Sequence, residues 1–165
     1  MTETTQDDRA KIAELVSRAG SAMLTTMTAD GKHVSRPMAV QETEFDGDLW
    51  FFAYDDSDKA GQIGAHPEVN VSFSNDKKSE WTSIAGAAEV VHDRQKAEQL
   101  WSKPLETWFP DGLETSGLSL IKVHADTAEY WDSSSSTIKQ VLGMRKAMRT
   151  DDPDQFPADN RTVDL

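Results

Sequence analysis

The sequence contains no cysteine, which excludes disulfide bonds, thiolate nucleophiles and zinc sites built on thiolates. Any redox chemistry must therefore come from a bound cofactor. Basic residues are also scarce, with 17 lysines and arginines against 29 acidic residues and a formal net charge of −12. Nucleic acids and anionic membranes are bound through basic side chains, so we expect no nucleic-acid partner and no membrane partner.

Long apolar runs are absent as well. No run approaches the roughly 20 residues of a membrane-spanning helix, and the first residues are charged where a signal peptide is apolar. These features predict a cytoplasmic protein. The length of 165 residues suits one domain with a buried core. We expect a single domain, with an N-terminal helix in 1–20, a barrel over 21–132, and a C-terminal helix and tail over 133–165.

Hydrophobic periodicity and turn residues predict the order of the elements. Six strands, joined mainly by hairpins, favour a closed antiparallel barrel, with a sheet covered by helices on one face as the alternative. Gly86 is expected to mark a bulge or a close approach, and Val163 and Leu165 are expected to dock from a polar tail. Helices are predicted over 6–19, 59–65, 93–103 and 137–149, and strands over 21–28, 68–74, 81–92 and 118–131, with a hairpin over 33–54 whose strands carry 35–38 and 49–53.

The stretch over 33–59 carries the most chemical information. It reads as a hairpin whose bend is Asp46-Gly47-Asp48, because Asp-Gly supplies positive φ. Arg36 lies on the first strand, while Ser57 and Lys59 follow the second. A guanidinium, an ammonium and a hydroxyl suit a phosphate group. The competing interpretation is that Arg36 is a solvated strand residue and Lys59 only opens a helix.

Several short motifs occur in a characteristic order between about 25 and 132, and together they resemble a known family. The chain is similar to the general stress protein 26 group of the pyridoxamine 5′-phosphate oxidase-like FMN-binding split barrels. The shared motifs are Ser35-Arg36-Pro37-Met38, Leu49-Trp50-Phe51-Phe52-Ala53, Ser57-x-Lys59, His66-Pro67, Val69-x-Val71-x-Phe73, Ser83-Ile84-x-Gly86, Trp108-Phe109-Pro110-Asp111-Gly112 and Glu129-Tyr130-Trp131-Asp132.

This resemblance implies a mainly β fold, a six-stranded antiparallel split β-barrel with flanking helices. It also implies a homodimer that binds FMN in two clefts at the interface. Arg36 and Lys59 would hold the phosphate, and Ser57 would donate a hydroxyl. The other implied cofactor-binding residues are Pro37, Met38, Phe52 and Ala53, together with Trp81 and Trp131 near the flavin ring.

Two departures from the oxidases limit what the resemblance implies. Asp58 stands where the oxidases have an arginine after their serine, so the phosphate loses one cation. Trp131 is followed by Asp132 and four serines in place of the oxidases' substrate-binding segment. Oxidation of pyridoxamine phosphate is therefore not expected, and the small-molecule substrate is unknown.

The resulting hypothesis is an FMN-dependent oxidoreductase of the general stress protein type. One alternative is a flavin carrier or sensor without turnover, and another is an enzyme that uses FAD or deazaflavin. No general base or other catalytic residue can be named. The four histidines lack metal-ligand spacing, so no metal site is predicted.

Overall fold

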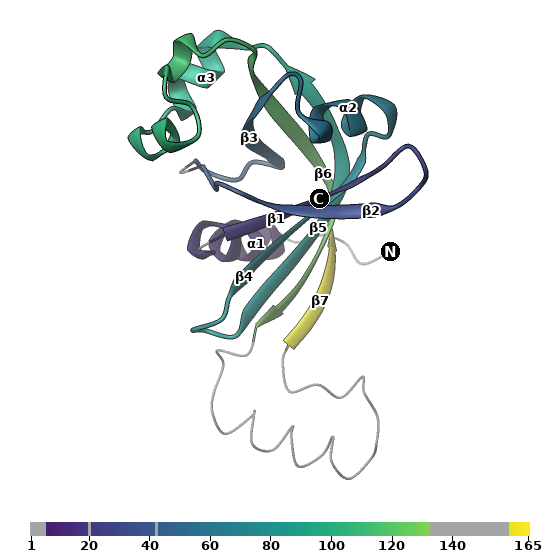
Figure 1. Cartoon of the computed structure of the whole chain (residues 1–165). Helices are drawn as coiled ribbons and strands as arrows, with labels where there is room; N and C mark the ends of the chain where they lie inside the picture. Colours follow the sequence, from purple (N-terminus) through teal and green to yellow (C-terminus); the bar gives the residue numbers. More distant parts are fainter. Residues whose placement is uncertain (1–5, 20, 42, 133–158) are drawn as a thin grey trace.

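The computed structural model describes residues 6–19, 21–41, 43–132 and 159–165, and these form a mainly β molecule (Figure 1). Seven antiparallel strands make one sheet in the order β2-β1-β4-β5-β6-β3, and β7 pairs with β6. The strands are β1 Ser21–Met27, β2 His33–Met38, β3 Asp48–Tyr54, β4 Glu68–Asn75, β5 Glu80–Val91, β6 Leu118–Asp132 and β7 Asp159–Asp164. The helices are α1 Gln6–Arg18, α2 Asp58–Ala65 and α3 Arg94–Leu100, with the 3-10 turns η1 Lys103–Thr107 and η2 Gly112–Glu114.

The sheet curls into a split barrel, as the sequence predicted, but with seven strands in place of six. The additional strand is β7, which pairs with the second half of β6. Val163, expected to dock from a polar tail, is only 2% exposed and joins the core. The predicted helix over 137–149 lies outside the described residues. No helix in the described part of the chain is long and apolar enough to cross a membrane.

The predicted hairpin over 33–54 is wrong. Strand β2 pairs with β1, placing Met38 opposite Ala22, whereas β3 pairs with β6, placing Phe52 opposite Leu120. Gly47 does adopt the expected positive φ of 108°. An Asp-Gly bend fixes local backbone geometry, but the pairing of β3 is decided by apolar surface that β6 supplies from far along the chain.

Strand β3 explains why two apolar clusters exist. Leu49, Phe51 and Ala53 point into the barrel and join its core. On the opposite face, Phe52 packs against Trp101 in an edge-to-face arrangement with ring centroids 5.4 Å apart, and Phe109 also contacts it. This outer cluster is covered by α3 and η1, which lie beside β3 in Figure 1. Strand β3 is therefore covered by apolar side chains on both faces, which explains why its sequence is apolar and aromatic without alternation.

A bulge interrupts the ladder between β5 and β6, and the expected close approach at Gly86 is confirmed. A Cβ at Gly86 would lie 2.1 Å from the carbonyl oxygen of His124. The pairing passes from Ala85 opposite Thr127 to Gly86 opposite Ala125, so that Asp126 is an extra residue on β6. Buried positions on β6 consequently change from odd-numbered to even-numbered residues, as at Ala125 and Ala128.

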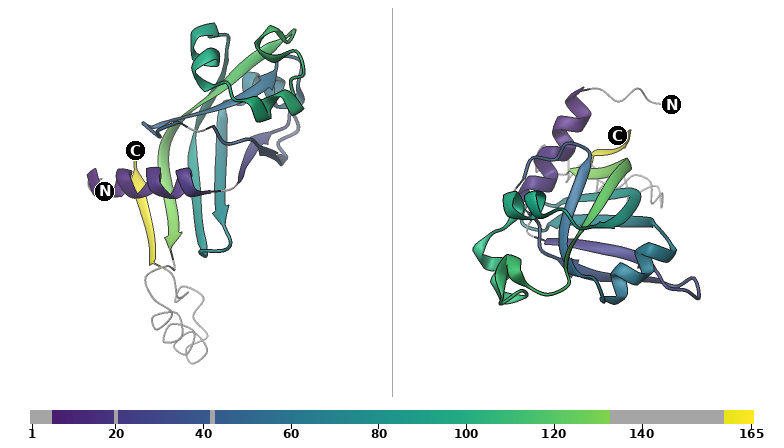
Figure 2. Two further views of the ribbon diagram at one scale, coloured as in Figure 1. Left: turned by 90° about the vertical axis from the view of Figure 1, so that its left-hand side faces the viewer. Right: turned by 90° about the horizontal axis from the view of Figure 1, so that it is seen from above.

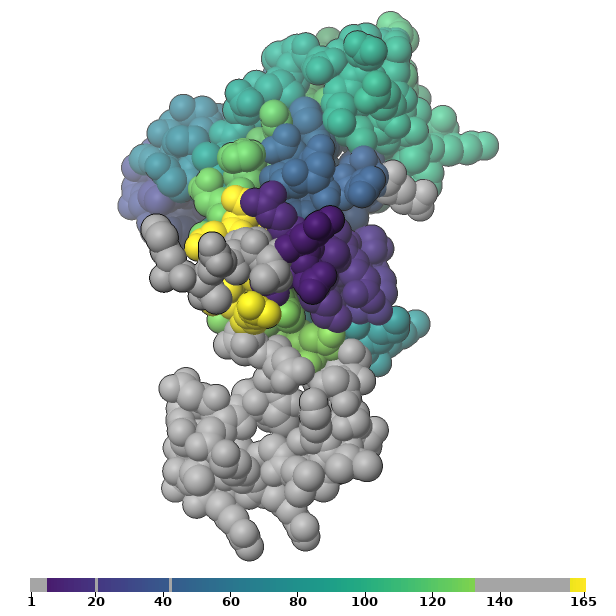
Figure 3. Space-filling view, turned by 180° about the vertical axis from the view of Figure 1, so that it is seen from behind, coloured from purple at the N-terminus to yellow at the C-terminus, as the bar shows by residue number. Residues whose placement is uncertain are grey.

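Helix α1 confirms the helix predicted over 6–19. It crosses the strands of the sheet (Figure 2). Its apolar side chains Ile12, Leu15 and Val16 are buried. Ion pairs join it to three strands, and Figure 3 shows α1 beside β7 on the rear face. These pairs are Lys11 with Asp132, Arg18 with Glu80 and Asp8 with Arg161.

Candidate functional site

A cleft of about 420 Å³ opens between β2, β3 and the segment around η1. Its volume falls within the roughly 300–1,000 Å³ of ordinary ligand sites. Apolar and aromatic side chains form most of its walls, and within 6–19, 21–41, 43–132 and 159–165 Lys59 is the only charged residue that lines it. The lining residues are Pro37, Met38, Ala39, Gln41, Phe52, Ala53, Tyr54, Lys59, Leu105, Trp108 and Phe109.

Arg36 is half-buried and held by neutral oxygen atoms. Its Nη1 donates to the carbonyl oxygen of Leu24 at 3.1 Å and to Oγ1 of Thr26 at 2.7 Å. Its Nη2 donates to Oε1 of Gln62 at 3.2 Å, and the Thr26 hydroxyl donates to that same oxygen. Burial lowers the pKa of Arg36, and Asp58 partly opposes this effect. The guanidinium is therefore fixed in place without a bound carboxylate.

Lys59 lies in the first turn of α2, close enough to Arg36 for their like charges to interact. Burial is the main cause that lowers the pKa of Lys59, and the neighbouring Arg36 lowers it further, whereas Asp58 opposes both. Among the described residues, no ion pair joins a carboxylate to either cation. Two half-buried positive charges therefore lie close together in a protein whose formal net charge is −12. Lys59 lines the cleft, whereas Arg36 neighbours Lys59 without being among the lining residues.

Ser57 is placed differently from its expected role. It occupies the N-cap position of α2, but its side chain does not cap the helix. Its Oγ donates to the carbonyl oxygen of Tyr54 at 2.7 Å. Ser57 lines a neighbouring depression together with Asp55, Asp56 and Asp58, and it is not among the residues that line the cleft. The Ser57 hydroxyl therefore donates its proton to the backbone of Tyr54 and not into the cleft.

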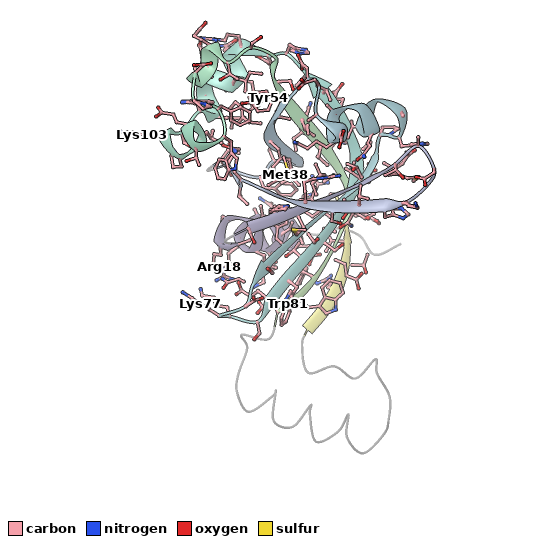
Figure 4. All side chains as sticks on the ribbon, in the orientation of Figure 1. Arg18, Met38, Tyr54, Lys77, Trp81 and Lys103 are labelled. Carbon is pink, nitrogen blue, oxygen red and sulfur yellow. The ribbon has the colours of Figure 1, made fainter. Side chains whose placement is uncertain are left out.

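The structure brings together the other expected residues of β2 and β3. Pro37, Met38, Phe52 and Ala53 all line the cleft, and Figure 4 shows Met38 and Tyr54 in the upper part of the molecule. The Tyr54 hydroxyl donates to the carbonyl oxygen of Trp108 at 2.7 Å, fastening β3 to the loop after η1. The cleft therefore combines a polar, cationic end with an apolar, aromatic body.

Trp81 and Trp131 lie elsewhere. They are directly opposite each other on β5 and β6, and Figure 4 shows Trp81 near the lower end of the coloured ribbon, away from Met38 and Tyr54. Tyr54 pairs with Leu118, so Trp131 stands 13 residues further along the same strand. At about 3.3 Å per residue the separation along β6 is roughly 40 Å. One chain therefore does not place these tryptophans at its own cleft.

Two residues of the cationic end were not predicted from the sequence, Thr26 and Gln62. Each bonds to Arg36, and they also bond to each other. They come from β1 and α2, and nothing in the local sequence marks them, because a threonine in a strand and a glutamine in a helix are ordinary. Trp108, which belongs to one of the shared sequence motifs, lines the cleft and is 58% exposed.

A family model described as "Pyridoxamine 5'-phosphate oxidase like" matches residues 7–154. The chain belongs to this family. The resemblance drawn from the short motifs is thereby confirmed. The candidate site of this chain is the cleft between β2, β3 and the segment around η1.

Individual relatives agree with this assignment. The protein bli-3 of Neurospora crassa is 29% identical over 148 residues, covering 84% of this chain and 71% of that protein. A general stress protein 26 from Jannaschia has the same fold, with a TM-score of 0.72 and 23% identity over 98% of this chain and 100% of its own. The general stress FMN/FAD binding protein of Xanthomonas citri has a TM-score of 0.68 and 26% identity over 80% of this chain and 93% of its own.

Proposed function

We propose that the cleft binds FMN, with the phosphate at Arg36 and Lys59 and the ring system among the apolar side chains of β2 and β3. The observation that carries this proposal is the pair of half-buried cations without a carboxylate partner in the described part of the chain. A buried charge is costly unless it is paired. An anionic ligand would supply the missing partner, and a relative is described as binding FMN or FAD.

The donor atoms of Arg36 fit a phosphate. A guanidinium has five N–H groups, and Leu24, Thr26 and Gln62 accept three of them. One N–H of Nη2 and the Nε–H remain for a ligand, and both lie on one edge of the planar fork. This edge suits two oxygen atoms of a phosphate, and it is pre-organised because Thr26 and Gln62 hold the other edge.

When bound, a flavin supplies hydride and electron transfer, and the chain supplies binding, orientation and exclusion of water. A flavin-dependent oxidoreductase is therefore the proposed activity. One observation favours a carrier or sensor as the second candidate, because no histidine or carboxylate is among the described residues that line the cleft. Turnover of a reduced nicotinamide with an electron acceptor distinguishes the two, and mass spectrometry of the released cofactor distinguishes FMN from FAD or deazaflavin.

A second copy of the chain is part of the proposal. Trp81 is 36% exposed, and its distance from the cleft along β6 exceeds the length of a flavin mononucleotide. Trp81 and Trp131 can meet the flavin only if the partner subunit brings them to it. We therefore expect a homodimer, measured by light scattering at micromolar concentration. A monomer of 18.3 kDa that still binds FMN would contradict the interfacial site.

The phosphate assignment is tested by titrating FMN and riboflavin, which lacks the phosphate, into wild type and Arg36→Ala. A hydrogen bond to a charged group contributes roughly 1.5–3 kcal/mol, or about 10- to 150-fold in affinity. Arg36→Ala should weaken FMN by this amount and leave riboflavin nearly unchanged. Lys32→Ala, which removes an exposed cation that is not among the residues lining the cleft, is the control. Equal weakening of both ligands would mean that Arg36 holds the ring or the fold.

A further inference from the structure

A second cavity, of about 280 Å³, is bordered by α3, η2, the end of β5 and the start of β6. No described residue lines both this cavity and the cleft between β2 and β3. The cavity combines a polar pair, Asp55 and His92, with a set of apolar side chains. This set is Val91, Ala97, Leu113, Leu118 and Leu120. We propose that the cavity binds a small primary amine, with its ammonium group at Asp55 and His92 and its hydrocarbon body against the apolar side chains.

The hydrogen bond between Asp55 and His92 determines what a ligand must offer. Nε2 of His92 lies 2.8 Å from Oδ1 of Asp55. An ionised carboxylate can only accept, so the imidazole proton is on Nε2 and is donated to Asp55. The neutral ring therefore presents Nδ1 as an acceptor, and Oδ2 of Asp55 accepts from no group in the described part of the chain. A primary ammonium group has three donors and no acceptor, and it matches this pair.

The charges at the cavity also favour a cation. Arg94 is among the lining residues, but Glu98 and Glu114 form ion pairs with it at 2.8 and 2.6 Å. Asp55 and Asp93 also line the cavity, and neither carboxylate forms an ion pair with a lysine or an arginine among the described residues. An anionic ligand would be repelled by these carboxylates, whereas an amine is attracted. The apolar side chains favour an amine whose hydrocarbon body leaves water on binding.

Isothermal titration calorimetry of the full chain with benzylamine tests the proposal. Benzyl alcohol keeps the ring without the charge, and methylamine keeps the charge without the ring. Each should bind at least about tenfold more weakly than benzylamine. No binding of benzylamine at millimolar concentration would overturn the proposal, as would equal affinity for benzyl alcohol.

Two neighbouring carboxylates provide a matched pair of variants. Asp55→Asn should weaken benzylamine by about tenfold. Asp56→Asn removes an adjacent carboxylate that does not line this cavity, and it should leave the affinity unchanged. Both residues are exposed, so the urea midpoint of unfolding should stay the same in both variants. Equal weakening by the two substitutions would show a general attraction of charge and would overturn the site.

A third variant separates the cavity from the cleft described above. Residues of β3 that line the cleft, such as Tyr54, lie opposite residues of β6 that line the cavity, such as Leu118. Trp108→Ala alters the wall of the cleft only, and benzylamine should bind this variant as it binds wild type. A loss of affinity in Trp108→Ala would place the amine in the cleft and overturn the proposal. None of these measurements depends on flavin binding.

Acid should release the amine. Protonation of His92 turns Nδ1 into a donor and places a positive charge beside the ammonium group. The other charged groups at the cavity and the adjoining hollow are Asp55, Asp93, Arg94 and Glu89. The affinity should fall from about pH 8 to about pH 5, the range in which histidine changes charge. His92→Gln should remove most of this decline, and an equal decline in that variant would overturn the assignment of the ammonium group to this pair.

Discussion

Two arginines at different places in the barrel meet opposite electrostatic surroundings. Arg18, at the end covered by α1, bonds to carboxylate oxygens of Glu14 and Glu80, each at 2.8 Å. Arg36, beside Lys59, bonds within the described part of the chain only to neutral oxygens, including that of Gln62. Both side chains are half-buried and held in one orientation. The difference is that two carboxylates neutralise the charge of Arg18, whereas no carboxylate in the described part of the chain forms an ion pair with Arg36.

This difference separates a structural charge from a binding charge. Glu80 is 3% exposed and follows the turn into β5, so Arg18 fastens α1 to the sheet. Arg36 is held equally firmly, but its neutral partners orient it without cancelling its charge. Lys59 adds a second positive charge nearby. The distribution of carboxylates around the two arginines therefore identifies the binding end more clearly than burial or hydrogen-bond count.

The largest expected effect comes from making Arg18 resemble Arg36. Glu80→Gln keeps the size and the hydrogen-bonding oxygen but removes the charge, leaving Arg18 with Glu14 as its only carboxylate. We expect the free energy of unfolding to fall by about 3 kcal/mol, the lower end for breaking a buried pair. Chemical denaturation measures this. Glu98→Gln, in the exposed pair with Arg94, should change it far less, because water screens an exposed ion pair. If Glu80→Gln and Glu98→Gln lower the free energy of unfolding by similar amounts, Arg18 is not a structural charge of the kind inferred here.

The reverse exchange, Gln62→Glu, should act on binding. It gives Arg36 a carboxylate partner and places a negative charge beside the proposed phosphate. FMN affinity should fall about tenfold, or about 1.4 kcal/mol, with riboflavin nearly unchanged. Gln6→Glu adds the same charge at the start of α1 and should leave both affinities unchanged. If FMN binds Gln62→Glu as tightly as wild type, the phosphate does not lie at Arg36.

The smallest effect is the dependence of binding on pH. The charged form of Lys59 binds a phosphate, and burial together with Arg36 lowers its pKa. The ratio of FMN to riboflavin affinity should therefore decline at a lower pH than the pKa of an ordinary lysine, about 10.4, would give. The decline should be less than tenfold. Lys59→Arg keeps its charge and should flatten the profile; a decline of equal size in that variant would exclude Lys59 as its source.

Much of the fold could be predicted because it depends on local patterns. The alternation of Val69, Val71 and Phe73 with polar residues indicated β4. Gly86 within a strand pattern indicated the bulge between β5 and β6. The pairing of β2 and β3 could not be predicted in this way. Strand β3 pairs with a strand that begins at Leu118, and a local turn signal carries no information about such a distant partner.

The residues of the candidate site also differ in whether the local sequence indicates their role. Arg36 and Lys59 were expected from their residue types and spacing, and the structure brings them together. Thr26 and Gln62 orient Arg36 only because β1 and α2 meet it in space, so their role is invisible in one sequence. Ser57 was expected to donate to the phosphate, but its proton goes to Tyr54, a choice that depends on the backbone conformation before α2.

The bulge at Gly86 has a consequence for insertions and deletions. Asp126 is the extra residue at which the inward-facing positions of β6 change from odd to even numbers, and its carbonyl oxygen accepts a hydrogen bond from Leu165. Losing Asp126 would restore a regular ladder and keep Ala128 and Asp132 facing inward. Losing one residue between Ala128 and Asp132 would instead turn Asp132 outward and break its pair with Lys11. Outside the bulge, strand β6 must therefore keep its length, and changes in chain length are better tolerated in surface turns such as that at Gly31.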